Sequence, residues 1–283
     1  MTTPEMAITG IGVVSSIGLG YHEFAAAVTQ GVTGLGPWSV DESILAAEIL
    51  EWDVRPYLVA EKTYLDRCSE FALAAAKLCS DDAGLTALPV SEERAGLALG
   101  TAFGCLGTME SYRERVLKRG VRSATPVLFS HAFVNTPASL VAIDFRLRGY
   151  HATLTSGAGS GEAALAAAIT ALACGHSDLV FAGGVEALTP ELVAVFGNAG
   201  LGDDPDAWDP YGEGGVALGE GAAMLLLEPL ERALSRGAAI RAVVSLTDEP
   251  GQEDLWVSGA NGGGRLADPR ASLGSAPKGL YGE

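Results

Sequence analysis

The segment that most constrains the fold of this chain covers residues 152–165 and reads A-T-L-T-S-G-A-G-S-G-E-A-A-L. Its β-branched residues end at Thr155, small residues fill a turn over residues 156–161, and alanines continue to about Ala173. This order predicts a strand, a tight turn and a helix, because small residues let the backbone bend sharply and approach its neighbours. The first N–H groups of such a helix stabilise negative charge. A reactive side chain at the apex would be activated there, but the apex is Ala158.

The rest of the chain alternates between short apolar runs and segments with helical spacing. The apolar runs predict strands over residues 7–14, 95–101, 179–182, 221–227 and 240–246, with a further strand around Thr153. The helical spacing predicts helices over residues 22–29, 64–78, 109–117, 138–145 and 230–236, with a short helix after Pro190. Strands that alternate with helices indicate an α/β fold whose central sheet is covered by helices on both faces.

With 283 residues, of which 48% are hydrophobic, the chain can form a large core in one or two domains. No apolar run approaches the ~20 residues of a membrane span, and the first residues, M-T-T-P-E-M, resemble no secretion leader. We therefore expect a cytoplasmic protein. The cysteines show neither the C-x-x-C spacing nor the histidine pairing of a metal or redox site. Buried free thiols are expected at Cys68, Cys79, Cys105 and Cys174.

The formal net charge of −17 restricts the possible partners. Nucleic acids and anionic membranes are disfavoured, because the field of this protein repels polyanions. One basic cluster lies in and just after a helix that is expected to begin near Leu106. It consists of Arg113, Arg115, Lys118, Arg119 and Arg122. This cluster is either a solvated helix face or a docking patch for a partner, and the sequence leaves both interpretations open.

The turn around Ala158 resembles the active-site turn of the β-ketoacyl synthases, the condensing enzymes of fatty-acid and polyketide assembly, whose pattern is T-A-C-[ST]-S-[SG]. In that family the cysteine carries the growing acyl chain. On this pattern Ala158 takes the place of the cysteine, and Ser160 that of the second small polar residue after it. Five further segments resemble the family in the same order: residues 6–18 (MAITGIGVVSSIG), 100–104 (GTAFG), 135–149, 178–186 (DLVFAGGVE) and 217–228 (ALGEGAAMLLLE).

The resemblance implies a thiolase-like layered α-β-α fold, with a first half that is essentially complete in a domain over residues 1–246. The second half is expected to be truncated to a shortened, loop-rich remnant over residues 247–283. Residues 256–268 (WVSGANGGGRLAD) resemble the family's Y-V-x-A-H-G-T-G-T-x-x-x-D, with Ala260 in place of the first catalytic histidine. The family segment that bears the second histidine has no counterpart in this sequence.

The gate beside the acyl site of the family is also altered. Its R-D-G-F motif falls on residues 211–216 (YGEGGV), which contain neither arginine nor phenylalanine. Residues 196–201 (FGNAGL) resemble the nearby gating loop and keep its phenylalanine, Phe196. We therefore expect this chain to keep a wall of the acyl pocket and to lack the gate residues beside it.

Claisen condensation needs a thiolate to hold the acyl chain, and imidazole donors to stabilise the charge that develops. Ala158 cannot supply the first, and no histidine of this chain matches a catalytic position of the family. The histidines are His22, His131, His151 and His176. His151 is expected at the start of its strand, as a structural or solvent-facing residue.

A stand-alone serine enzyme is one alternative, with Ser156 or Ser160 as the nucleophile. Such a serine needs a base within ~3 Å, which the sequence does not place, and G-A-G-S-G is not the G-x-S-x-G elbow of hydrolases. Loss of thioester hydrolysis or acyl transfer on Ser160→Ala would support this alternative. A second alternative is a purely structural or regulatory pseudoenzyme, which would leave product length unchanged when its pocket is altered.

The resemblance favours a non-catalytic ketosynthase-like subunit, similar to the chain length factors of type II polyketide synthases, with no cofactor of its own. An active ketosynthase would pair with it in a heterodimer or higher heteromer, over ~2,000 Å² or more. The acyl chain would arrive on the phosphopantetheine of an acyl carrier protein that docks on the partner, because an acidic carrier is poorly attracted to this acidic chain. The expected tunnel and interface residues are Asn135, Thr136, Pro137, Ser156, Ala158, Ser160 and Phe196.

Overall fold

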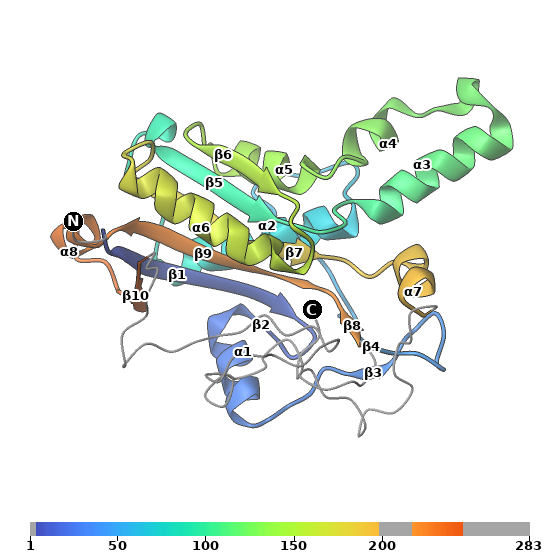
Figure 1. The fold of residues 1–283 in the computed structure, drawn as a ribbon, viewed down its shortest axis with the longest axis horizontal. Helices are drawn as coiled ribbons and strands as arrows, with labels where there is room; N and C mark the ends of the chain where they lie inside the picture. The colour runs from blue at the N-terminus through green and yellow to red at the C-terminus, as the bar shows by residue number, and fades with distance from the viewer. Residues whose placement is uncertain (1–3, 198–216, 246–283) are drawn as a thin grey trace.

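The computed structural model of this chain describes residues 4–197 and 217–245, and its centre is a mixed β-sheet (Figure 1). The strand order in the described part is β10-β1-β9-β7-β5-β6, and a short β2 pairs with β1. Their bounds are β1 (Met6–Ser15), β2 (Gly18–Leu19), β5 (Ala95–Gly100), β6 (His151–Leu154), β7 (Leu179–Glu186), β9 (Gly221–Pro229) and β10 (Ala242–Val244). β5 is parallel to both β6 and β7, whereas β9 is antiparallel to β7 and β1.

Helices cover both faces of this sheet, as the alternation of elements predicts (Figure 1). α2 (Arg67–Asp82) and α5 (Thr136–Asp144) pack on one face, and α6 (Ser160–Ala173) packs on the other. Strand β5 shows the division, since Leu97 and Leu99 belong to the core beneath α2 while Ala98 belongs to the core beneath α6. Successive side chains of a strand point to opposite faces. β5 is therefore buried on both sides, which explains its continuous run of apolar and small residues.

Two smaller units lie outside this central body. α3 (Leu106–Arg119) and α4 (Pro126–His131) form an arm that projects away from it (Figure 1). The second unit, which we call the α7 unit, contains α7 (Pro190–Gly197) and a small sheet of β3 (Gly36–Pro37), β4 (Leu45–Ala47) and β8 (Leu218–Gly219). It has an apolar core of its own, made of Trp38, Ala46, Leu188, Leu192, Val193 and Leu218.

The predicted strands and helices are present, with shifted ends. α2 begins at Arg67, later than the spacing indicates, because the Asp66 carboxylate caps it by accepting a hydrogen bond from the Cys68 N–H (2.9 Å). The same carboxylate accepts the Thr108 hydroxyl (2.6 Å), which ties the start of α2 to α3. Of the strand expected over residues 240–246, β10 covers Ala242–Val244, and residue 246 lies outside the described part.

Several short elements were not expected from the sequence. They are α4, the small sheet, and the 3₁₀ turns at Arg55–Tyr57, Glu92–Arg94, Val121–Ser123 and Gly157–Gly159. The helix predicted over residues 22–29 is α1, which begins two residues earlier and spans Gly20–Thr29. α8 (Leu230–Ser235) agrees with its prediction. None of the helices in the described ranges combines the length and the apolarity of a membrane span. The division into domains 1–246 and 247–283 stays a prediction, since the second lies outside the described residues.

The prediction of buried thiols is correct for three cysteines and wrong for the fourth. Cys68, Cys79 and Cys105 are buried free thiols, whereas Cys174 is exposed. Cys174 is the C-cap of α6 and follows the last buried turn of that helix, so its side chain reaches solvent. Burial raises the pKa of the Cys105 thiol to about 12, and it raises the pKa of Cys68 and Cys79 well above the usual value.

Alkylation of the folded protein at pH 8 should therefore modify Cys174 alone. The three buried thiols are shielded from reagent, and their raised pKa values keep them in the unreactive protonated form. Mass spectrometry after brief iodoacetamide treatment would count the adducts, and the same reaction in denaturant should modify all four cysteines. Rapid labelling of Cys105 in the native protein would contradict the packing of α2 against α3.

Candidate functional site

The candidate site lies where three parallel strands end. Since β5, β6 and β7 run in the same direction, the loops that follow them leave from one edge of the sheet. Ligands of α/β sheets commonly bind outside the carboxyl ends of the strands. The loops here are residues 101–104, the turn at residues 155–159, and residues 187–189 before α7. The Thr101 N–H donates to the Leu154 carbonyl (3.0 Å), which joins the first loop to the strand that precedes the turn.

The turn between β6 and α6 has a structure that its small residues explain. Gly157 has φ of +65°, a left-handed conformation that favours glycine, and a single 3₁₀ turn over Gly157–Gly159 leads into α6 at Ser160. The helix thus begins inside the segment expected to be the turn. Ala158 lies at the centre of this turn and is exposed. The position predicted for a nucleophile is therefore accessible and carries a methyl group.

The hydroxyl of Ser160 is used to close the turn. Its side chain is buried, donates to the Gly157 carbonyl (2.6 Å) and accepts the Ser156 N–H (2.9 Å). The hydroxyl proton thus points at a carbonyl, and in the described part of the chain no histidine or carboxylate accepts it. A serine nucleophile needs a base as its hydrogen-bond partner. This geometry fits a structural role for Ser160.

Glycines bring the start of α6 directly onto the strand ends. A Cβ on Gly100, the last residue of β5, would lie 2.1 Å from the Ser160 carbonyl oxygen and 2.7 Å from the Gly161 nitrogen. Gly184 of β7 lies on the other side, with its virtual Cβ 3.3 Å from the Gly161 Cα. By contrast, a Cβ on Gly159 would meet nothing within 4 Å. The close approach of helix to sheet, rather than the turn as a whole, is what requires glycine at position 100.

Glu186, the last residue of β7, holds the loop that follows β5. Its carboxylate accepts the Thr101 hydroxyl (3.0 Å), the Ala102 N–H and the Phe103 N–H (3.3 Å). The loop in turn places the Phe103 ring edge-on against Phe196 of α7, with 6.0 Å between ring centroids. Phe196, expected as a pocket wall, therefore reaches the edge of the sheet from which the turn also leaves.

The other predicted tunnel residues lie at the base of the arm. Asn135 is exposed just before α5, whereas Thr136 and Pro137 are buried in its first turn. The Thr136 hydroxyl donates to the Ser130 carbonyl (3.2 Å), and its N–H donates to the Phe133 carbonyl (3.0 Å). Their hydrogen bonds thus run to the arm, and none within the described residues joins them to the turn at Ala158. Residues 198–201, 211–216 and Ala260 lie outside the described part.

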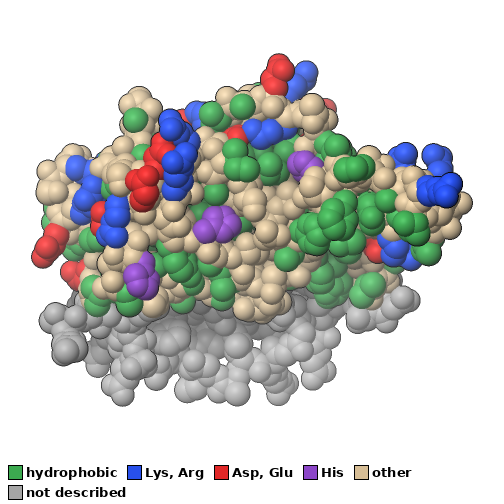
Figure 2. Space-filling model, turned by 90° about the horizontal axis from the view of Figure 1, so that it is seen from above, with side chains coloured by type: hydrophobic (Ala, Val, Ile, Leu, Met, Phe, Trp, Pro, Cys, Tyr) green, Lys and Arg blue, Asp and Glu red, His purple; other side chains and the backbone are tan. Residues whose placement is uncertain are grey.

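The exposed surface of the arm is a feature that the sequence did not reveal. Hydrophobic side chains gather along it, with basic side chains at its far end (Figure 2). The exposed large apolar residues of the arm and of the loops that flank it are Phe103, Met109, Leu117, Val121, Val127, Phe129, Phe133 and Val134. Phe129 and Phe133 also contact each other, with 5.0 Å between centroids. Their spacing of four residues would place both rings on one face of a helix. This signal was missed because the short α4 was not predicted.

The five cations of the basic cluster are all exposed on the arm. Arg113 pairs with Glu110 (2.7 Å), Lys118 pairs with Glu114, and Arg115 donates to the Ser123 carbonyl (2.8 Å). Arg119 and Arg122 project from the end of α3 and from the turn that follows it. A solvated face and a docking patch both remain compatible with this geometry.

A cavity of about 400 Å³ lies beside the site, between the starts of α2, α3 and α7. Its lining includes Tyr64, Arg67, Thr108, Leu188 and Glu191, and no residue of the turn at Ala158. The Tyr64 hydroxyl and Thr108 hydroxyl are hydrogen-bonded to each other across it (2.8 Å). Within residues 4–197 and 217–245, no group of three or more histidine, cysteine or acidic side chains is arranged to hold a metal ion.

Comparison with known proteins gives a consistent result. The family model described as "Beta-ketoacyl synthase, N-terminal domain" matches residues 3–233. The 3-oxoacyl-[acyl-carrier-protein] synthase 2 of Coxiella burnetii is 29% identical over 261 residues, which cover 86% of this chain and 62% of that protein. The synthase of the same name from Synechocystis sp. is 28% identical and covers 83% of this chain and 60% of its own length. The chain thus spans about three fifths of the curated relatives that it matches.

Solved structures agree on the fold. "The ishigamide ketosynthase/chain length factor" superposes with a TM-score of 0.78 at 29% identity, over 86% of this chain and 62% of that one. A β-ketoacyl synthase from Burkholderia phymatum STM815 superposes with a TM-score of 0.73 at 28% identity, over 85% of this chain and 62% of that one. These matches confirm the predicted thiolase-like α/β fold.

Proposed function

Because the chain belongs to the β-ketoacyl synthase family, we propose that it is a non-catalytic ketosynthase-like subunit, a chain length factor, that pairs with an active ketosynthase in polyketide or fatty-acid-like chain elongation. The observation that carries this proposal is the turn at residues 155–159, which keeps its sharp, accessible geometry around Ala158. A thiolate is the group that would carry the acyl chain at such a position. The methyl group of Ala158 cannot form that bond.

The described surface supports the pairing half of the proposal. β6 ends the sheet order, and no described strand pairs with its outer edge. The arm and the loop that follows α4 expose Phe129 and Phe133, at 52% and 42% of their full accessibility. An open strand edge and an exposed apolar surface are features that proteins usually cover. A ketosynthase of the same family, with a matching edge strand, is the partner whose shape fits this surface.

In the proposed assembly, a cytoplasmic heterodimer or higher heteromer, the partner supplies the cysteine, the histidines and the main docking site for acyl carrier protein. The acyl chain enters on phosphopantetheine and is bound covalently to the partner. This chain contributes the wall formed around Phe196 and the loop at Phe103, and it limits the space into which the product grows. The synthases among its relatives are catalytic by name. Stand-alone condensing activity is therefore the rival that the test must exclude.

Co-expression with an active ketosynthase of a type II polyketide synthase tests the proposal. We expect a 1:1 complex by size exclusion with light scattering, condensation of malonyl units by the complex, and no condensation by this chain alone. The matched control is the complex whose ketosynthase cysteine is replaced by alanine, which should form normally and be inactive. Condensation by this chain alone, or full ketosynthase activity in its absence, would contradict the proposal.

The length of the products distinguishes a chain length factor from a purely structural or regulatory subunit. If the chain bounds the acyl tunnel, Phe196→Ala in the complex should enlarge the available space and lengthen the products, because truncation of an aromatic wall leaves a cavity. A purely structural subunit would give products of unchanged length. Liquid chromatography with mass spectrometry of the released chains measures the difference.

A further inference from the structure

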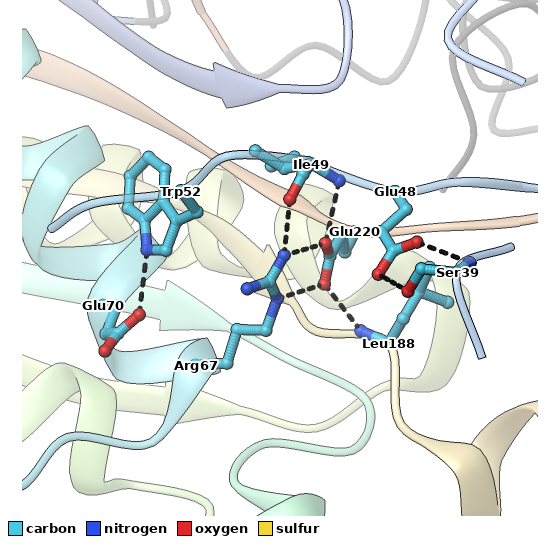
Figure 3. Close-up of polar contacts among 8 residues, drawn as sticks. All are labelled: Ser39, Glu48, Ile49, Trp52, Arg67, Glu70, Leu188 and Glu220. Carbon is cyan, nitrogen blue, oxygen red and sulfur yellow. Dashed lines mark hydrogen bonds and ion pairs between the residues drawn. The ribbon is translucent and has the colours of Figure 1, made fainter.

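One buried carboxylate joins four segments that are far apart in the sequence (Figure 3). Glu220 lies between β8 and β9, and only 1% of its side chain is exposed. It accepts both ends of the Arg67 guanidinium, from Nε (2.8 Å) and from Nη2 (2.5 Å), and the N–H groups of Ile49 (2.9 Å) and Leu188 (3.1 Å). Arg67 Nη2 also donates to the Ile49 carbonyl (2.7 Å). All the acceptor positions of a carboxylate are thus used.

These contacts cross from the central body to the α7 unit. Arg67 is the first residue of α2, which packs on the main sheet, whereas Leu188 belongs to the apolar core of the α7 unit. Ile49 follows β4 of the small sheet, and Glu48 beside it accepts the N–H (3.0 Å) and hydroxyl (2.8 Å) of Ser39 (Figure 3). The carboxylate therefore fastens both chain segments that lead into the α7 unit to the start of α2.

A solvent-open hollow separates part of the α7 unit from the central body. The cavity of about 400 Å³ lies between the start of α2 and the first turn of α7, and its lining includes Arg67, Leu188, Pro190 and Glu191. Apolar packing on this side is therefore incomplete. Ile49 and Ala187 pack in the core of the central body, and directional hydrogen bonds to Glu220 add to this packing in fixing the distance between the two units there.

We infer that the Arg67–Glu220 ion pair is a positioning device that sets where α7, and with it Phe196, stands against Phe103 at the edge of the candidate site. The link to product length rests on the proposed function. The positioning itself does not, because it follows from the contacts of Glu220 with Leu188 and of Phe196 with Phe103. Loss of the carboxylate charge leaves the guanidinium half-buried without its partner and weakens the hold on the Leu188 N–H.

The chain offers a matched control at the far end of β9, the strand that follows Glu220. Glu228, in β9, has a side chain that is 0% exposed and is paired with Arg236 (2.5 Å) and with the Thr9 hydroxyl (2.8 Å). It is a buried carboxylate–arginine pair like the first, but its contacts lie in β1 and just after α8, away from the α7 unit. Glu220→Gln and Glu228→Gln thus remove the same charge from similar surroundings, and only the first touches α7.

Hydrogen–deuterium exchange of residues 187–197 distinguishes local positioning of α7 by the ion pair from a contribution to global stability alone. We expect exchange in Glu220→Gln to be faster than in the unmodified chain by about tenfold or more, with no such change in Glu228→Gln. Equal acceleration in both variants, or in neither, would overturn the inference, since a merely structural pair would act through global stability alone. If Glu220→Gln fails to fold, Arg67→Lys keeps the charge, loses the two-pronged contact and should give the same local acceleration.

Product length in the complex with the ketosynthase tests the consequence separately. A shifted length distribution with Glu220→Gln, and an unshifted one with Glu228→Gln, is expected. An unshifted distribution together with faster local exchange would overturn the link to product length and leave the positioning established. If the unmodified chain forms no active complex, the proposed function fails, and the exchange measurement still decides whether the ion pair positions α7.

Discussion

Thr153→Pro should leave the chain folded and strongly weaken its pairing with a ketosynthase. The carbonyls of Tyr150 and Leu154 accept hydrogen bonds from β5, so in a parallel ladder the backbone groups of Thr153 point to the open edge of β6. Proline at this position removes an N–H that only a partner strand would use, and edge strands tolerate proline. We expect the affinity to fall by about tenfold or more. Analytical ultracentrifugation of the mixed subunits would measure it.

Two controls distinguish this effect from a general loss of structure. Thr153→Val keeps the N–H and removes a buried hydroxyl that has no hydrogen-bond partner, so both folding and pairing should survive. Ala152→Pro removes an N–H that faces β5 instead, so the free energy of unfolding should fall in the isolated chain. A Thr153→Pro chain that still forms a tight complex would show that β6 is not part of the interface.

Gly100→Val should be the most destabilising single substitution in the candidate site. Its Cβ would overlap the Ser160 carbonyl at 2.1 Å and the Ser160 carbonyl carbon at 2.2 Å, and both are backbone atoms that cannot rotate away. Either α6 lifts from the sheet or β5 breaks its pairing with β6. We expect a loss of roughly 3 kcal/mol or more in the free energy of unfolding. Chemical denaturation of the isolated chain measures the loss.

Gly159→Ala is the matched control within the same turn. Its φ is −90°, which alanine adopts readily, and an added Cβ there meets nothing within 4 Å. The substitution should therefore be neutral or stabilise the chain by up to about 1 kcal/mol, because it restricts the unfolded state. If Gly159→Ala and Gly100→Val destabilise the chain equally, the cost comes from the turn in general and not from the contact of α6 with β5.

Local patterns in the sequence were sufficient to predict the turn at Ala158 and the helices on both faces of the sheet. Small residues at positions 156–161 are typical of a tight turn, which the structure contains. The buried strand over Ala95–Gly100 is recognisable from its continuous run of apolar and small residues. The start of α2 was placed too early, because its cap, Asp66, is held by Thr108 of α3. A contact between segments so far apart leaves no periodic trace in the sequence.

The α7 unit and its ion pair could not be predicted for the same reason. Strands β3, β4 and β8 are two or three residues long, too short to show alternation. Arg67 and Glu220 are 153 positions apart, and only the fold brings them together. Phe196 was predicted from a family motif, whereas its ring contact with Phe103 required the structure. The exposed face of the arm was missed because α4 is a single short helix that begins with proline.

The open edge of β6 has a consequence for the life of the protein in the cell. No described strand pairs with the outer edge of β6, and such an edge, in a chain that also exposes the rings of Phe129 and Phe133, is a template on which identical chains can add to one another. On the proposed function, a chain made without its ketosynthase would be exposed to aggregation and to proteases from the moment it folds. Synthesis of the two proposed subunits at the same time and place would then be a condition for yield, and the ratio of their production would set how much of this chain survives.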